Sequence, residues 1–155
     1  MRLPAEQVKE GILHERQMVR DLAVRYFTDA YSRDPDVMPR AVEAIETHGW
    51  HESFDVPGSG LADLVQTEPT LLWAMEQVEA VAGEQTLAAQ ERCVRLGALI
   101  CWTSVELLAR HHGRIAELPG LDAEYKKVVA DRLRLVDRSA EDVWDELVDW
   151  CERAG

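Results

Sequence analysis

Apolar residues recur at intervals of three and four along most of this chain, and this spacing restricts its fold more than any other feature. The segment from Gly11 to Tyr31 shows it best, with apolar side chains at Met18, Val19, Leu22, Ala23, Tyr26, Phe27 and Ala30. Such a spacing places one broad apolar stripe along an α-helix. We therefore expect a long amphipathic helix here, with Leu22 facing the core and the other helices packing beside it.

The same spacing returns in later segments, which proline, glycine and helix-capping residues separate. The boundaries that we expect are Pro4 for the first helix, then Asp36 and Gly49, Thr67 and Gly83, Gln85 and His112, and the caps Asp122 and Ser139. Alternating runs typical of strands are short and lie inside stronger helical patterns. The sequence thus predicts an all-α fold of about six to eight helices, forming a single all-helical domain over residues 1–155.

An apolar pair, a polar turn and a Val-Arg-x-x-Ala motif follow one another near the start of the chain, at Ile12, Leu13, Val19, Arg20 and Ala23. This arrangement resembles the helix–turn–helix unit of HEAT and armadillo-like repeats. The turn departs from the family, because Glu15 and Arg16 stand where Asp-Pro is usual. The resemblance implies a superhelical stack of helix pairs, or an irregular bundle, that holds a protein partner on a helical surface. It also implies that Arg20 braces neighbouring turns instead of binding a ligand.

The charge balance restricts the kinds of partner. Lys and Arg number 17 and Asp and Glu number 29, so the formal net charge is −12. Such a surface repels nucleic-acid phosphates and anionic membranes, and it favours a basic protein partner. We expect no leader, because Pro4, Glu6 and Glu10 interrupt the start of the chain, and no run of about eighteen apolar residues that could span a membrane.

Three cysteines, Cys93, Cys101 and Cys151, fall inside helical patterns. An odd number of cysteines at such positions is typical of reduced core thiols in a cytoplasmic protein. We therefore expect a cytoplasmic location. Among the tryptophans, the spacing favours core positions for Trp73, Trp102 and Trp144, and partial exposure for Trp50 and Trp150.

The helical pattern lapses from Trp50 to Gly60, where Pro57, Gly58 and Gly60 form the strongest breaker cluster in the chain. We expect a loop of about ten residues here, and loops of this length are often functional. One interpretation makes this edge the recognition site. Its partner-binding candidates, together with the tryptophan near the chain end, are Trp50, His51, Phe54 and Trp150. The alternative is that Trp50 only fills the end of a groove between two helices.

Candidate chemistry is sparse. Two imidazoles and a carboxylate at His48, His51 and Glu52 could bind zinc, but their spacing matches no established motif, and we favour a plain helix end. His111 and His112 end a helix, where a cation complements the helix dipole. The sequence therefore indicates no catalytic residue, no bound metal and no cofactor.

These observations favour a non-enzymatic binding or scaffold module for a protein partner. Two alternatives remain at this point. One is a metal-dependent helical enzyme built on His48, His51 and Glu52. The other is a HEAT-like module of the DNA-repair type, which the net charge of −12 disfavours.

Overall fold

A computed structural model describes residues 3–54, 60–136 and 140–155. These residues form α-helices and one 3₁₀ turn, η1, in the order α1 Ala5–Gly11, α2 Gln17–Asp29, α3 Val37–His48, α4 Trp50–Ser53, η1 Leu61–Asp63, α5 Glu68–Ala80, α6 Leu87–Cys101, α7 Val105–Ala116, α8 Ala123–Val136 and α9 Ala140–Ala154. No strand occurs in the described ranges, so the all-α prediction is confirmed. Within those ranges, no helix combines the length and the apolar character that crossing a membrane requires.

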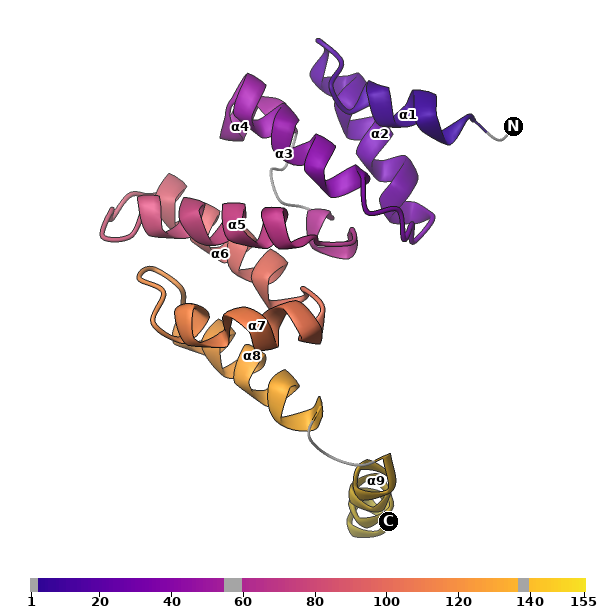
Figure 1. The fold of residues 1–155 in the computed structure, drawn as a ribbon, viewed down its shortest axis with the longest axis vertical. Coiled ribbons are helices and arrows are strands. Elements are labelled where there is room, and N and C mark those ends of the chain that lie inside the picture. The colour runs from indigo at the N-terminus through magenta and orange to yellow at the C-terminus, as the bar shows by residue number, and fades with distance from the viewer. Residues whose placement is uncertain (1–2, 55–59, 137–139) are drawn as a thin grey trace.

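Consecutive helices pack together in pairs, and the pairs follow one another along the molecule (Figure 1). α1 packs on α2, α3 on α4, α5 on α6 and α7 on α8, while α3 contacts α5 and α6 contacts α8. One hydrophobic core runs through this stack, from Ile12 near α1 to Val129 in α8. The core buries side chains from both halves of the chain, so the paired helices stabilise one another.

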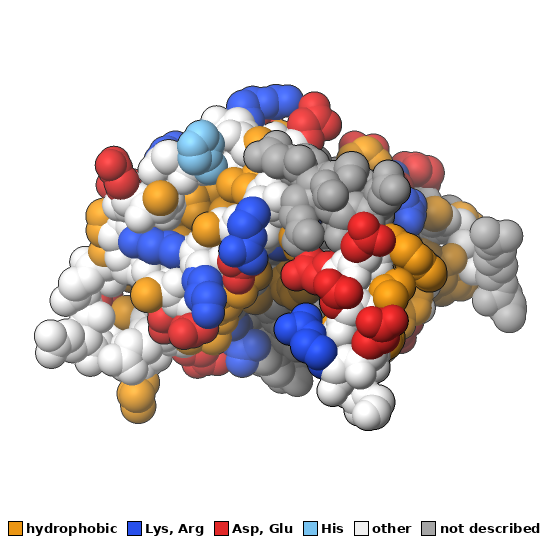
Figure 2. Space-filling model, turned by 90° about the horizontal axis from the view of Figure 1, so that it is seen from below, with side chains coloured by type: hydrophobic (Ala, Val, Ile, Leu, Met, Phe, Trp, Pro, Cys, Tyr) orange, Lys and Arg blue, Asp and Glu red, His pale blue; other side chains and the backbone are white. Residues whose placement is uncertain are grey.

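The last helix lies outside this core. α9 extends beyond α8 at the end of the molecule opposite α1, and Figure 2 views the molecule from that end. Its described side chains, residues 144–155, are all exposed. Trp144 is 65% exposed, so the interpretation of this tryptophan as a core residue is wrong.

The buried face of α2 differs from the predicted one. Ala23, Val24 and Phe27 are buried, whereas Leu22 is 58% exposed. The prediction that Leu22 faces the core is therefore wrong. A broad apolar stripe has two edges, and only one of them can face the core. The other edge lines a groove of about 600 Å³ between α1 and α2.

An ion-pair cluster around the buried Lys9 joins α1 to the turn between α2 and α3. Lys9 is only 3% exposed, and its Nζ lies 2.7 Å from Asp34, 2.9 Å from Glu6 and 3.7 Å from Asp36. Its hydrogen bonds to Asp34 and Glu6 raise the pKa of Lys9, and the bond to Lys9 lowers the pKa of Asp34. α3 begins after Asp36 as predicted, but the Asp36 side chain makes no capping hydrogen bond.

The predicted helix from Gln85 to His112 is two helices. α6 ends at Cys101, and Ser104 begins α7 by accepting a hydrogen bond from the backbone N–H of Leu107 at 3.5 Å. Thr103 turns its hydroxyl back to donate to the carbonyl of Leu99 at 3.0 Å. This break leaves Trp102 at a helix end with 64% of its surface exposed, so its interpretation as a core residue is also wrong.

Candidate functional site

The predicted recognition edge at Trp50 is part of the core. Trp50 is 7% exposed and Phe54 is 4% exposed, so both side chains are packed inside the protein. The first residues of the expected loop form the helical turn α4, and the guanidinium of Arg92 lies 5.2 Å from the centre of the Trp50 ring. The His51 side chain and residues 55–59 lie outside the described residues. The alternative, in which Trp50 fills the end of a groove, agrees with this burial.

Arg20 explains why this turn is held against the core. It is 3% exposed and donates hydrogen bonds only to backbone carbonyl oxygens in the contacts described. Nε donates to Ser53 at 2.6 Å and Nη2 to Glu52 at 2.5 Å. Nη1 donates to His14 at 2.7 Å and to Glu15 at 2.8 Å. This arginine is a brace between α4 and the turn before α2.

The described residues do not assemble the expected metal ligands. No group of three or more His, Cys, Asp and Glu side chains within the described ranges is placed to hold a metal ion. His48 is half-buried and Glu52 is exposed, while His51 has no described side chain. The metal hypothesis therefore gains no support from the part of the chain that can be seen.

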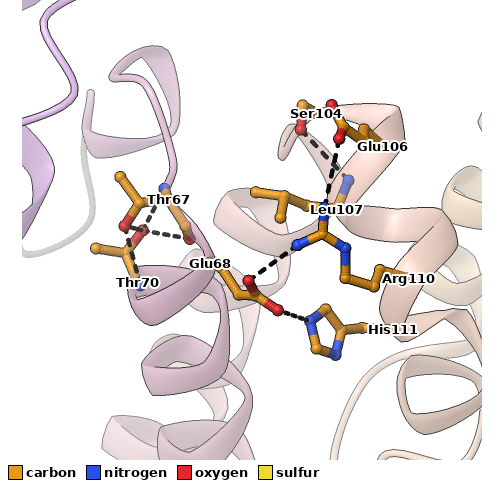
Figure 3. A network of polar contacts seen from close by, with 8 residues as sticks. All are labelled: Thr67, Glu68, Thr70, Ser104, Glu106, Leu107, Arg110 and His111. Atoms are coloured by element: carbon orange, nitrogen blue, oxygen red, sulfur yellow. Dashed lines mark hydrogen bonds and ion pairs between the residues drawn. The ribbon is translucent and has the colours of Figure 1, made fainter.

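A polar network centred on Glu68 joins α5 to α7 (Figure 3). One carboxylate oxygen lies 2.8 Å from His111 Nε2, and the other accepts a hydrogen bond of 3.0 Å from Arg110. These partners, His111 first, lower the pKa of Glu68. The neighbouring hydroxyls of Thr67 and Thr70 form the capping box of α5. The network thus ties α5 to α7 through an acid, an imidazole and a guanidinium.

A large hollow lies where α2, η1 and α6 end. It has a volume of about 820 Å³ and is lined by Tyr31, Ser32, Arg33, Ala62, Asp63, Leu64, Val65, Gln66, Trp102 and Ser104. We call it the aromatic groove, because Tyr31 is 83% exposed and Trp102 is 64% exposed. Neither residue was a candidate from the sequence. The available signal was position, since Trp102 directly follows α6 and Tyr31 lies two residues after the end of α2, each next to polar turn residues.

Backbone and side-chain contacts hold the aromatic groove in shape. Tyr31 has a positive φ of 50°, a conformation that few non-glycine residues adopt. Gln66 is buried, and its Nε2 donates to the carbonyls of Leu61 at 2.9 Å and Leu64 at 3.1 Å. These two hydrogen bonds hold residues 61–66, which form one wall of the groove, in a fixed conformation.

The rim at Trp102 is fixed in the same way. The guanidinium of Arg132 lies 5.6 Å from the centre of the Trp102 ring. Arg132 Nη1 also donates to the carbonyls of Cys101 and Thr103, the latter at 2.7 Å. A residue of α8 therefore supports an exposed aromatic side chain at the end of α6. Because the Trp102 side chain is already held in place, a partner that binds it would cost less conformational entropy.

Trp150, the remaining sequence candidate, lies on α9 and is 62% exposed, which agrees with the predicted exposure. It is far along the chain from the aromatic groove and belongs to a separate surface. Comparison of the chain with protein-family models, with curated proteins and with solved structures gives no match in any of the three.

Proposed function

We propose that this chain is a non-enzymatic binding module that holds an extended segment of a protein partner in the aromatic groove. The observation that carries the proposal is the pair of exposed aromatic residues, Tyr31 and Trp102, on one hollow of about 820 Å³. Tyr and Trp are enriched at binding hot spots, because their rings bury a large area at a small entropic cost. A hollow of this volume accommodates several side chains.

The chemistry of the groove narrows the class of partner. Arg33 and Asp63 place both signs of charge on its lining, and the chain as a whole carries a net charge of −12. Long-range attraction therefore favours a basic segment, while the two aromatic rings favour an apolar or aromatic side chain within it. The partner that fits best is a peptide with an apolar anchor flanked by Lys or Arg.

The stacking of consecutive helix pairs supports the likeness to HEAT and armadillo-like modules, which use helical surfaces for binding. No specific observation favours the two alternatives. His48 and Glu52 do not gather with other ligands in the described residues, and the acidic excess opposes contacts with DNA phosphates.

Selection from a random peptide library on the purified, immobilised chain tests the proposal. We expect enriched peptides to carry an apolar anchor with basic flanks, and to lose at least about tenfold in affinity on the Trp102→Ala or Tyr31→Ala variant. Leu87→Ala is the matched control, because Leu87 is 84% exposed but lies outside the groove. Failure to enrich any peptide, or equal binding by all three variants, would contradict the proposal.

A further inference from the structure

Among the side chains that the structure describes on the last helix, residues 144–155, the apolar ones have no cover. Four apolar side chains on α9 are strongly exposed, namely Trp144 at 65%, Leu147 at 48%, Val148 at 38% and Trp150 at 62%. Trp144, Leu147, Val148 and Cys151 follow the spacing of one helix face. Asp145 and Glu152 border this face along one edge, and Asp149 lies on the polar side of the helix. A helix of this length is marginal by itself in water, so α9 requires a surface to pack against.

The outer face of α8 has the complementary chemistry. Val128 is 36% exposed and Leu135 is 47% exposed, and they lie two turns apart on the same side. Lys127 and Arg134 border them, and Asp131 on the same side is already paired with Arg134 at 3.3 Å. Figure 2, which views the molecule from the end that carries α9, shows acidic side chains beside a hydrophobic column right of the centre. Several Lys and Arg side chains lie to the left of them.

The charges on the two helices have the same spacing. Lys127 and Arg134 are seven residues apart on α8, and so are Asp145 and Glu152 on α9. Each of the two bases directly precedes an exposed apolar residue, Val128 or Leu135, whereas each of the two acids directly follows one. Charges on such opposite edges meet when two packed helices run parallel, as the e and g positions do in parallel coiled coils. Antiparallel packing separates them.

The need for parallel packing decides whether the α9 that covers α8 comes from the same chain or from a second copy. Only residues 137–139 separate α8 from α9, and two helices that pack on each other across so short a connection run antiparallel. Folding back within one chain would therefore leave the acids on the wrong side of α8. We propose that α9 of one chain packs parallel on the exposed face of α8 in a second copy, and that the exchange is reciprocal. A two-fold dimer then forms the same contact twice.

The groove between α1 and α2 is another apolar surface that could receive α9. It is lined by Arg25 and Asp29 together, so it has no excess of positive charge to meet an acidic helix. Leu22 lies in that groove and is 58% exposed, and a charge placed there reports on this competing arrangement.

Sedimentation equilibrium of the full chain measures the proposed association. We expect a concentration-dependent dimer, which Leu147→Asp converts to a monomer. Leu87→Asp and Leu22→Asp should leave the dimer intact. The double reversals Lys127→Glu with Arg134→Glu, and Asp145→Lys with Glu152→Lys, should each raise the dimer dissociation constant at least about tenfold. The chain carrying all four reversals should recover most of that loss. Asp149→Lys, on the polar face of α9, is the matched charge control and should have little effect.

The possible results distinguish the surfaces on which α9 could pack. A monomer at every concentration would overturn the proposal, whether α9 then packs on its own chain or stays exposed. A dimer that Leu22→Asp abolishes, or one insensitive to the α9 variants, would overturn it as well. Circular dichroism of each variant shows that the helical fold is kept. None of these changes touches the aromatic groove, so the outcome is independent of the proposed peptide binding.

Discussion

The Nε atom of Arg20 donates a hydrogen bond of 2.6 Å to the carbonyl oxygen of Ser53, thirty-three positions further along the chain. The same guanidinium reaches carbonyls on the turn before α2, so one side chain satisfies acceptors of two separate segments. A buried charge is costly unless it is hydrogen-bonded. Each guanidinium nitrogen of Arg20 donates to at least one backbone oxygen, and the arginine thereby fixes where α4 and Trp50 lie.

Replacing Arg20 tests this brace. Hydrogen bonds that involve a charged group contribute about 1.5–3 kcal/mol, and Arg20→Ala removes several at once, so we expect a loss of about 3 kcal/mol or more in unfolding free energy. Arg20→Lys should recover little of it, because an ammonium cannot reproduce the planar fork of donors. Chemical denaturation measures both. The exposed Arg25→Ala is the control and should stay within about 0.5 kcal/mol. Equal stability of Arg20→Ala and the parent would contradict the bracing role.

A comparison of two leucines tests which edge of α2 is buried. Leu22 is 58% exposed, so Leu22→Ala should lower the unfolding free energy by less than about 1 kcal/mol. Leu99 in α6 is 1% exposed, and Leu99→Ala should cost about 2–5 kcal/mol. Urea denaturation of the two variants gives both values. A large loss for Leu22→Ala would restore the original prediction that this residue faces the core.

Gly97 permits a close approach of α8 to α6. A Cβ atom at this position would lie 2.5 Å from Cδ2 of Tyr125, and the Tyr125 hydroxyl donates to the Val94 carbonyl at 3.0 Å. Gly97→Ala should therefore destabilise the protein by about 1–3 kcal/mol, although alanine favours a helix by about 1 kcal/mol. Gly113→Ala in α7 is the matched control, because a Cβ there meets nothing within 4 Å. It should be stabilising, and thermal melting distinguishes the two signs.

Acid should remove the contribution of Glu68 to the free energy of unfolding. Its pKa lies below the usual value of 4.5 because His111 and Arg110 bond its carboxylate. A lowered pKa contributes stability that is present above the usual pKa and is lost as the pH falls through the folded-state pKa. The stability difference between the parent and Glu68→Gln should thus be present at neutral pH and shrink as the pH falls below the usual pKa of 4.5. Glu106→Gln, at an exposed ion pair with Arg110, should change the stability at neutral pH very little.

The three cysteines should differ in reactivity. Burial raises the pKa of Cys101 to about 11 and also raises the pKa of the half-buried Cys93. Cys151 on α9 is exposed, which corrects the prediction that all three are core thiols. With a thiol reagent at mildly alkaline pH, Cys151 should react first and Cys101 only after unfolding. Cys151→Ser should remove the fast phase, and a fast phase that survives this change would contradict the assignment.

The sequence alone was sufficient for the fold class and for most helix boundaries, because both depend on local features. Apolar spacing predicts helices wherever it persists, and Thr67 begins α5 with a capping box at the predicted position. The exposure of Trp150 also agreed with the sequence. The break between α6 and α7 was missed, because an apolar run conceals the capping role of Ser104.

The location of a site could not be obtained in this way. In the structure Trp50 begins α4 and Trp102 directly follows α6, yet Trp50 is 7% exposed and Trp102 is 64% exposed. Packing against residues distant in the chain decided the difference: Arg20 draws α4 into the core, and Arg132 supports Trp102 at the rim of the aromatic groove. Periodicity reports which residues share a helix face. Which edge of that face meets another helix depends on long-range contacts, and only the tertiary structure contains them.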